Sequence, residues 1–238
     1  MTVVDAGVAL GWDPPEGTTA RGTVVVLPGR GEHGGVYERF GRRLAADGYR
    51  VRALDRAPAT VSAARAAVGA VLAEPDELPR PHVLAGSDSG AVLALAVASD
   101  AGADALVVAG YPVAAGYAAD SADAEIEART SCPVHAGRLR DDPRFAASAL
   151  DGPLPDGVPL GSVAVPVLAL HGDADVVSPY PAARAALSAV PDVVLVTLAG
   201  GRHDAFNDRS HRTAAAHVVL FLEDLRAGAA VAASERLD

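Results

Sequence analysis

The chain has 238 residues, half of them hydrophobic, which is enough to bury the core of one α/β domain but too few for two full domains. Its formal net charge is −10, and all twenty basic residues are arginines scattered along the sequence. An acidic chain without a basic run is a poor binder of nucleic acid, so we expect a small-molecule substrate and no nucleic-acid partner.

Cysteine usage and hydropathy limit the compartment and the cofactors. The single cysteine, Cys132, excludes an intramolecular disulfide and a cysteine-based zinc cluster. His135 is the other side chain near Cys132 that could bind a metal, and two such side chains are too few for a metal site. Residues 1–17 lack the basic and apolar regions of a signal peptide, and no segment is long enough to span a bilayer. We therefore expect a cytoplasmic protein with no membrane partner, no metal and no cofactor.

Apolar, β-branched runs alternate with helical patterns along the chain. The expected strands are residues 22–29, 49–55, 82–86, 103–110, 165–172 and 192–200. The expected helices are residues 36–48, 61–74, a segment that begins at Gly90, and 211–228. Because the strand cores are wholly apolar, this alternation predicts a mostly parallel sheet with helices on both faces.

The alternation stops between residues 112 and about 163. This segment is rich in Pro, Asp, Gly and Arg and contains no strand-like run. We interpret it as a short cap-like insertion over the edge of the sheet. It belongs to a single domain of residues 1–238, because no low-complexity linker interrupts the chain.

The stretch "VLAGSDSGAVLALAVA" predicts a strand that turns sharply into a helix. Such a turn needs small residues two positions before and after its tip, and Gly86 and Gly90 provide them for Asp88. The frames centred on Ser87 and Ser89 also have small flanking residues. The glycine pair favours Asp88 at the tip, and both serines stay open as alternative nucleophiles.

Two more polar segments follow expected strands, at the edge where a parallel sheet binds ligands. "LHGDADVVSP" places Asp173 and Asp175 after one strand, and "AGGRHDAFND" places His203 after the last. We favour Asp175 as the partner of His203, with Asp173 as a rival that instead caps the following turn. The chain order of nucleophile, acid and histidine is that of α/β-hydrolases.

These segments resemble the α/β-hydrolases, and in particular their monoglyceride lipases and lysophospholipases. "VVVLPGRGEHGG" is similar to the opening of that group, where a His-Gly pair precedes x-Gly-Glu-His, and "HGDADVVSP" and "GGRHDAFND" are similar to its acid and histidine segments. The resemblance covers most of residues 22–225 and is weakest in the cap. It implies an α/β-hydrolase fold, esterase-like activity, and an oxyanion hole formed by the backbone N–H groups of Arg30 and Ser89.

Two positions depart from the lipase pattern. Pro28 stands where the group has histidine, and Asp88 stands where lipases have serine. Epoxide hydrolases and haloalkane dehalogenases resemble this chain in having aspartate there. Dehalogenases often bind halide with a tryptophan after the nucleophile, whereas this chain has Ser89 there and its only tryptophan is Trp12. The resemblance therefore leaves esterase and epoxide hydrolase chemistry open.

The leading hypothesis is a hydrolase that acts on a small ester, epoxide or related electrophile through an Asp88–His203–Asp175 triad. Asp88 attacks carbon, and His203, oriented by Asp175, activates the water that opens the resulting ester. One alternative is a serine esterase or thioesterase that uses Ser87 or Ser89. A second alternative is a non-hydrolytic ligand-binding protein, cyclase or isomerase in which Asp88 is a base.

Further residues beside these segments complete the expected site. Gly29, His33 and Tyr111 are candidate substrate-binding residues, although His33 fits better as a residue that orders the loop around it. Tyr111 and Tyr117 lie at the start of the cap, and epoxide hydrolases use cap tyrosines as general acids.

Overall fold

The computed structural model describes residues 2–4, 9–74, 78–233 and 235. Within these ranges eight strands form one sheet in the order β1-β2-β4-β3-β5-β6-β7-β8. The strands are β1 (Thr2–Val4), β2 (Ala9–Trp12), β3 (Thr23–Leu27), β4 (Arg50–Leu54), β5 (His82–Ser87), β6 (Ala105–Ala109), β7 (Val167–Gly172) and β8 (Val193–Leu198). All neighbours from β4 to β8 are parallel, so the predicted parallel sheet is confirmed.

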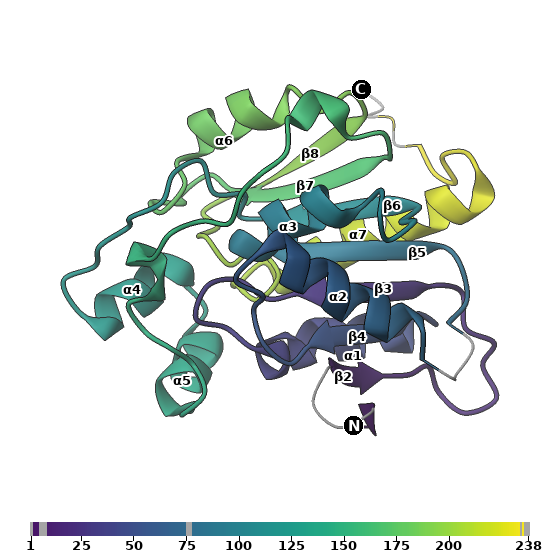
Figure 1. The fold of residues 1–238 in the computed structure, drawn as a ribbon, viewed down its shortest axis with the longest axis horizontal. Coiled ribbons are helices and arrows are strands. Elements are labelled where there is room, and N and C mark those ends of the chain that lie inside the picture. Colours follow the sequence, from purple (N-terminus) through teal and green to yellow (C-terminus); the bar gives the residue numbers. More distant parts are fainter. Residues whose placement is uncertain (1, 5–8, 75–77, 234, 236–238) are drawn as a thin grey trace.

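Helices cover both faces of the sheet (Figure 1). One face carries α2 (Val61–Leu72), α3 (Ser89–Val97) and α6 (Tyr180–Leu187), and the other carries α1 (Glu38–Ala46) and α7 (His211–Ala227). Because both faces are covered, β3, β5, β6 and β7 have no exposed position, as their apolar strand cores predict.

Every expected strand and helix is present, and the ends differ from the expected ones by a few residues. The antiparallel pair β1–β2 is an addition that the sequence patterns did not predict. β2 pairs with β4 through a register that places Trp12 opposite Val51. This pair extends one edge of the sheet, away from the strands that carry the polar segments.

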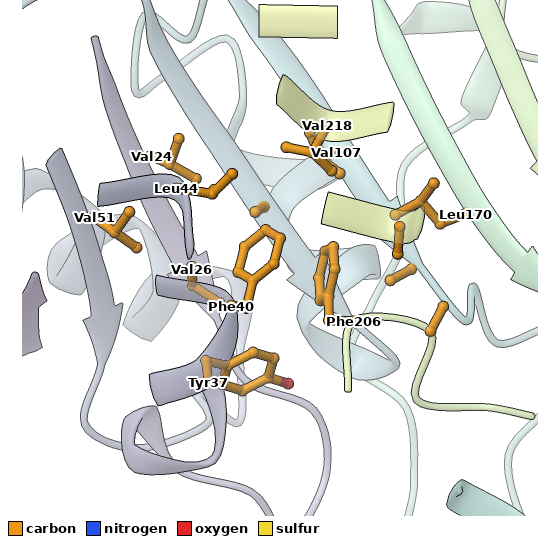
Figure 2. Close-up of a cluster of buried hydrophobic side chains, with 14 of the residues drawn as sticks. Val24, Val26, Tyr37, Phe40, Leu44, Val51, Val107, Leu170, Phe206 and Val218 are labelled. Atoms are coloured by element: carbon orange, nitrogen blue, oxygen red, sulfur yellow. The ribbon is translucent and has the colours of Figure 1, made fainter. Parts of the chain in front are cut away.

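A buried aromatic cluster fixes the position of the loop after β8 (Figure 2). The rings of Phe40 on α1 and Phe206 in that loop lie 4.5 Å apart between centroids, and Tyr37 meets Phe206 edge-on at 6.2 Å. Aromatic pairs of this kind contribute about 1 kcal/mol beyond their buried area. Because Phe206 follows His203 by three residues, this packing restrains the histidine.

Residues 110–166, all of which the structure describes, contain no strand. They form α4 (Ala122–Arg129), α5 (Pro133–Asp141) and two short 3₁₀ turns, Ala149–Asp151 and Leu160–Ser162. In Figure 1, α4 and α5 lie beside one end of the sheet. The buried Asp208 ties this cap to the loop after β8, because its Oδ1 accepts hydrogen bonds from Thr130 Oγ1 at 2.9 Å and from the Ser131 N–H at 2.6 Å.

None of the helices in the described ranges is long and apolar enough to cross a membrane.

Candidate active site

The turn between β5 and α3 has Asp88 at its tip. Asp88 has φ 48° and ψ −122°, a conformation that costs a residue with a side chain on the order of 1–3 kcal/mol. The turn closes tightly, because a Cβ atom on Gly86 would lie 2.2 Å from Gly90 O and one on Gly90 would lie 2.1 Å from Leu27 O. The glycine pair thus frames Asp88, as the spacing predicts.

The two flanking serines occupy different positions from Asp88. Ser87 is the last residue of β5, and Ser89 is the first of α3. Burial and Glu32 raise the pKa of the Tyr37 hydroxyl, whereas a hydrogen bond with the Ser87 side chain lowers it. Within the described ranges, the ring of His203 bonds to neither serine.

His203 lies between two carboxylates in the loop after β8. Its Nδ1 is 2.8 Å from Asp175 Oδ2, and its Nε2 is 3.3 Å from Asp88 Oδ1. All three side chains are buried, with at most 1 % of their surface exposed. The three residues of the predicted triad therefore come together in the order that the sequence suggests, although their catalytic roles stay predictions.

The buried charges shift all three pKa values. Burial alone lowers the pKa of His203, but the charge of Asp175, its hydrogen bond and Asp88 raise it to about 10. Burial raises the pKa of Asp88, but hydrogen bonds from Arg30 and His203 outweigh it and hold that pKa far below the usual range. Burial likewise opposes ionisation of Asp175, and the charge of His203 and bonds from two histidines lower its pKa. At neutral pH, His203 is therefore an imidazolium between two carboxylates.

Asp175 is held by its own loop. Its Oδ1 accepts hydrogen bonds from the N–H groups of Val177 at 2.8 Å and Ser178 at 2.9 Å. The buried His171, which sequence reasoning missed, places its Nε2 3.2 Å from Asp175 Oδ2 and 2.8 Å from the Ser178 carbonyl. The only signal for His171 is its place at the end of a buried strand.

Asp173, the rival acid, points elsewhere. It is exposed, and its Oδ1 accepts a hydrogen bond from the Gly200 N–H at 2.6 Å. It therefore joins the loops after β7 and β8. It has no hydrogen bond to His203 among the described residues.

The contacts of Arg30 differ most from those that the sequence predicts. Its backbone N–H, expected as an oxyanion donor, donates to Asp88 Oδ2 at 3.0 Å. Its guanidinium also binds Asp88, with Nε 2.8 Å from Oδ2 and Nη2 2.7 Å from Oδ1. Nη1 donates to two cap carbonyls, Leu150 O at 2.8 Å and Gly152 O at 2.9 Å. Both oxygens of Asp88 are thus paired with an arginine that is only 8 % exposed.

The cap also supplies a second buried arginine. Arg129 of α4 donates to Arg30 O at 2.8 Å, to Glu32 Oε1 at 3.2 Å and to Glu125 Oε1 at 2.8 Å. Burial, and next the charge of Asp204, raise the pKa of Glu32, while Arg129 lowers it. The i,i+4 spacing of Glu125 and Arg129 is visible in the sequence, but such pairs usually lie on exposed helix faces.

A cavity of about 390 Å³ lies next to the elbow. Its lining includes Arg30 and Ser89, and residues 57–59 and 152–155 form most of the rest. Asp88 does not line the cavity, whereas Arg30, its ion-pair partner, does. Ser89, the other expected oxyanion donor, thus faces this space.

Gly29 and His33 help to shape the loop around Arg30. A Cβ atom on Gly29 would lie 3.0 Å from Asp88 Cβ, a tight contact that the neighbouring atoms would have to relieve, so glycine favours this close approach of the loop to the elbow. His33 Nδ1 accepts a hydrogen bond from the Gly35 N–H at 3.1 Å, and its Nε2 is 2.7 Å from Asp142 Oδ2 of the cap. His33 therefore orders the loop and joins it to the cap.

The candidate tyrosines lie in apolar surroundings. Tyr111 packs half-buried against the core beneath α2 and α3, and burial raises the pKa of its hydroxyl. Tyr117 packs against a small buried cluster of Ala128, Leu150 and Val177. Gly29, His33 and Tyr111 do not line the 390 Å³ cavity, so their roles in substrate binding stay predictions.

A metal site is not evident in the ranges that the structure describes, where no group of three or more His, Cys, Asp and Glu side chains is arranged to hold an ion. His135 Nε2 lies 2.7 Å from Asp204 Oδ2, and Cys132 Sγ lies 3.7 Å from an arginine nitrogen of Arg39. These two side chains are thus bound to other partners.

The candidate side chains follow the parallel strands β5, β7 and β8, and the first of them lies on a strained strand-to-helix turn. This arrangement is typical of the α/β-hydrolase fold. Comparisons with known proteins agree. The family model described as serine aminopeptidase, S33, matches residues 18–57, and the model described as TAP-like protein matches residues 151–232. No curated protein matches the chain significantly.

Several solved structures share the fold. A monoacylglycerol lipase from Paleococcus ferrophilus has 19% identity and a TM-score of 0.69, over 91% of this chain and 99% of that one. A soluble variant of monoglyceride lipase from Saccharomyces cerevisiae has 15% identity and a TM-score of 0.75, over 91% of each chain. An esterase from Rhodococcus sp. ECU1013 has 19% identity and a TM-score of 0.69, over 92% of this chain and 99% of that one. These likenesses show that the chain has the α/β-hydrolase fold, in an arrangement similar to that of monoglyceride lipases.

Proposed function

We propose that this protein hydrolyses a small ester or epoxide through a covalent intermediate on Asp88. The observation that carries the proposal is the direction of His203, whose Nε2 faces Asp88 Oδ1 on the elbow and bonds to neither neighbouring serine within the described residues. The likeness to lipases and esterases supports a substrate with a carbon–oxygen bond to be cleaved.

In the first step, Asp88 Oδ1 attacks an sp³ carbon that bears the leaving oxygen. The new bond forms between Oδ1 and carbon, and the carbon–oxygen bond of the substrate breaks. Because the pKa of His203 is raised to about 10, the imidazolium holds a proton that it gives to the leaving oxygen. The products of this step are an alkyl ester on Asp88, a neutral His203 and a hydroxyl or carboxyl group.

In the second step, the charges that raised the pKa of His203 have changed. Asp88 is now uncharged, so His203, still oriented by Asp175, accepts a proton from the water that attacks the Asp88 carboxyl carbon. The oxyanion develops on Oδ2, which the Arg30 N–H and Nε already approach at 3.0 and 2.8 Å.

Collapse of this intermediate restores the enzyme. The alcohol oxygen leaves and takes a proton from His203. The regenerated Asp88 acid then returns a proton to His203, so that the starting carboxylate and imidazolium are formed again. Water thus supplies one oxygen to Asp88 in every turnover.

The test is a single turnover in water enriched in heavy oxygen, followed by peptide mapping. We expect the label in the peptide that contains Asp88, and none in that peptide from Asp88→Asn. A fluorophosphonate probe provides the opposing measurement. Labelling of Ser87 or Ser89 that disappears in Ser87→Ala or Ser89→Ala would contradict the proposal and identify a serine esterase.

A further inference from the structure

The cavity beside the elbow carries a single charge. Among the described residues that line it, Arg30 alone has an ionisable side chain, and the others are glycine, alanine, proline, leucine and serine. A volume of about 390 Å³ suits a small molecule. The lining therefore matches a compact, mostly apolar ligand with one anionic group directed at the guanidinium.

In the resting structure, Arg30 opposes the attack that the proposed function requires. Its Nη2 donates to Asp88 Oδ1 at 2.7 Å, and Oδ1 is the oxygen that His203 Nε2 also faces. A carboxylate oxygen that is bound to a guanidinium is a weak nucleophile, because its lone pair and charge are shared. Nη2 must therefore leave Oδ1 before Asp88 reacts.

The cap keeps the guanidinium at the cavity when this bond breaks. Nη1 is bound to Leu150 O and Gly152 O, and Gly152 belongs to the cavity wall. Nε and the backbone N–H are bound to the other oxygen of Asp88, Oδ2. Nη2 is thus the one guanidinium nitrogen that can exchange partners while the others keep theirs.

We propose that the substrate carries a carboxylate beside its electrophilic carbon, and that this carboxylate replaces Asp88 Oδ1 as the partner of Arg30 Nη2. The chemical class is a small epoxy acid, or a small hydroxy acid whose hydroxyl group is acylated and whose carboxylate is free. The inference has two halves. The binding half, that Arg30 holds the carboxylate of a ligand, stands without the proposed function. The catalytic half, that this ligand then reacts at Asp88, rests on the proposed function.

Charge balance supports this substrate class. Alkylation of Asp88 removes the only carboxylate that the guanidinium of Arg30 contacts in the described structure. An unpaired buried charge is strongly unfavourable, so a neutral substrate would leave the covalent intermediate with an uncompensated guanidinium. A substrate carboxylate supplies the missing charge and remains in place through the second step.

The binding half is tested with butyrate and butyramide, which differ mainly in charge, by calorimetry at low chloride concentration. Asp88→Asn leaves the guanidinium without its counter-ion, so we expect it to bind butyrate about tenfold more tightly than the wild type does. Butyramide should gain nothing, and Asp88→Asn/Arg30→Gln should lose the butyrate site. Equal binding of the two probes by Asp88→Asn, or butyrate binding unchanged in the double variant, would overturn the inference.

The catalytic half is tested with 2,3-epoxypropanoate and its amide. We expect kcat/KM to favour the acid by about a hundredfold in the wild type, and this ratio to approach one in Arg30→Gln. Arg30→Lys, which keeps the charge but not the forked geometry, should retain part of the preference. Thermal melting of each variant verifies that it is folded.

The two proposals fail in different ways. Equal turnover of acid and amide by the wild type would overturn the carboxylate class and leave Asp88 hydrolysis standing. Butyrate binding as expected, without turnover of either compound and without label in the Asp88 peptide, would refute the proposed function and leave the anion site at Arg30 standing.

Discussion

The two sides of His203 hold their carboxylates in different ways. On one side, Asp175 accepts hydrogen bonds from the N–H groups of Val177 and Ser178, two and three residues further along its own loop. On the other side, Asp88 is paired with Arg30, which lies 58 residues away in the sequence and is anchored by a cap carbonyl. One side is a local turn, and the other is assembled from three distant segments.

This difference suits the two carboxylates to different functions, because Asp175 is held in one position and the surroundings of Asp88 can change. The Asp175 carboxylate is held by backbone groups that cannot move without unfolding its loop, so it is suited to orienting His203 throughout the reaction. The Asp88 carboxylate is paired with the Arg30 guanidinium, which the cap anchors and which lines the neighbouring cavity, so the proposed ligand carboxylate would change the reactivity of Asp88. The proposed function accordingly gives the orientation of His203 to the Asp175 side and covalent chemistry to the Asp88 side.

The largest expected effects are on catalysis, where loss of Asp88 and loss of Asp175 should block different steps of the reaction. Asp88→Asn removes the proposed nucleophile, and we expect kcat to fall by about 10⁴-fold with no covalent intermediate. Asp175→Asn leaves Asp88 able to attack but leaves His203 poorly oriented, so the alkyl-enzyme should accumulate. Intact-protein mass spectrometry during turnover distinguishes the two, and an absence of the adduct in Asp175→Asn would argue against this division.

The next effect concerns the buried ion pair. Arg30→Leu leaves the Asp88 carboxylate buried without its guanidinium, which we expect to lower the free energy of unfolding by about 3–5 kcal/mol. In the Asp88→Asn background the same substitution should cost much less, because no carboxylate is left unpaired. Urea unfolding of the four proteins in this cycle measures the coupling. Equal costs in the two backgrounds would show that Arg30 acts through packing alone.

Sequence patterns predict the Asp175 side well because that side is local. The buried strand β7, the loop after it and the glycine-rich segment before His203 each follow from short stretches of sequence, and so does the framing of Asp88 by Gly86 and Gly90. The parallel sheet is predictable for the same reason, since each strand shows its burial in its own apolar run.

The Asp88 side was predictable only at the backbone. The oxyanion expectation concerned the Arg30 N–H, whereas the direction of the Arg30 side chain depends on the carbonyls of Leu150 and Gly152, some 120 residues away. Arg129 was missed for the same reason, because its i,i+4 partner Glu125 makes it look like part of an exposed helix face. Contacts that join the cap to the sheet leave no periodic signal in the sequence.

The free energy of unfolding should depend on pH, because both the Asp175 side and the Asp88 side raise the pKa of His203. The pKa of His203 is about 10 in the folded protein and 6.5 for an ordinary histidine, so the folded state binds the extra proton between these values. This stabilisation is complete below about pH 6.5 and is lost as pH rises through about 10, with a slope of up to about 1.4 kcal/mol per pH unit.

Substitutions of His203 and of its two carboxylate partners test which groups cause this pH dependence of the free energy of unfolding. His203→Gln should lack it, and Asp175→Asn should narrow the pH window more than Asp88→Asn does, because Asp175 raises the pKa of His203 more strongly. Urea unfolding from pH 6 to pH 10 measures this. Parallel pH profiles for the wild type and His203→Gln would show that His203 is not charged in the folded protein.

The smallest effect concerns Asp173, the acid two residues before Asp175. Asp173→Ala removes one hydrogen bond to the Gly200 N–H at an exposed position, which we expect to cost at most about 1 kcal/mol and to leave kcat within about twofold. Asp173 holds the loop and Asp175 holds the histidine, so the adduct that accumulates in Asp175→Asn should be absent in Asp173→Ala. A large loss of activity in Asp173→Ala would mean that the loop after β8 depends on this one bond to position His203, and that the Asp175 side is less self-contained than its backbone contacts suggest.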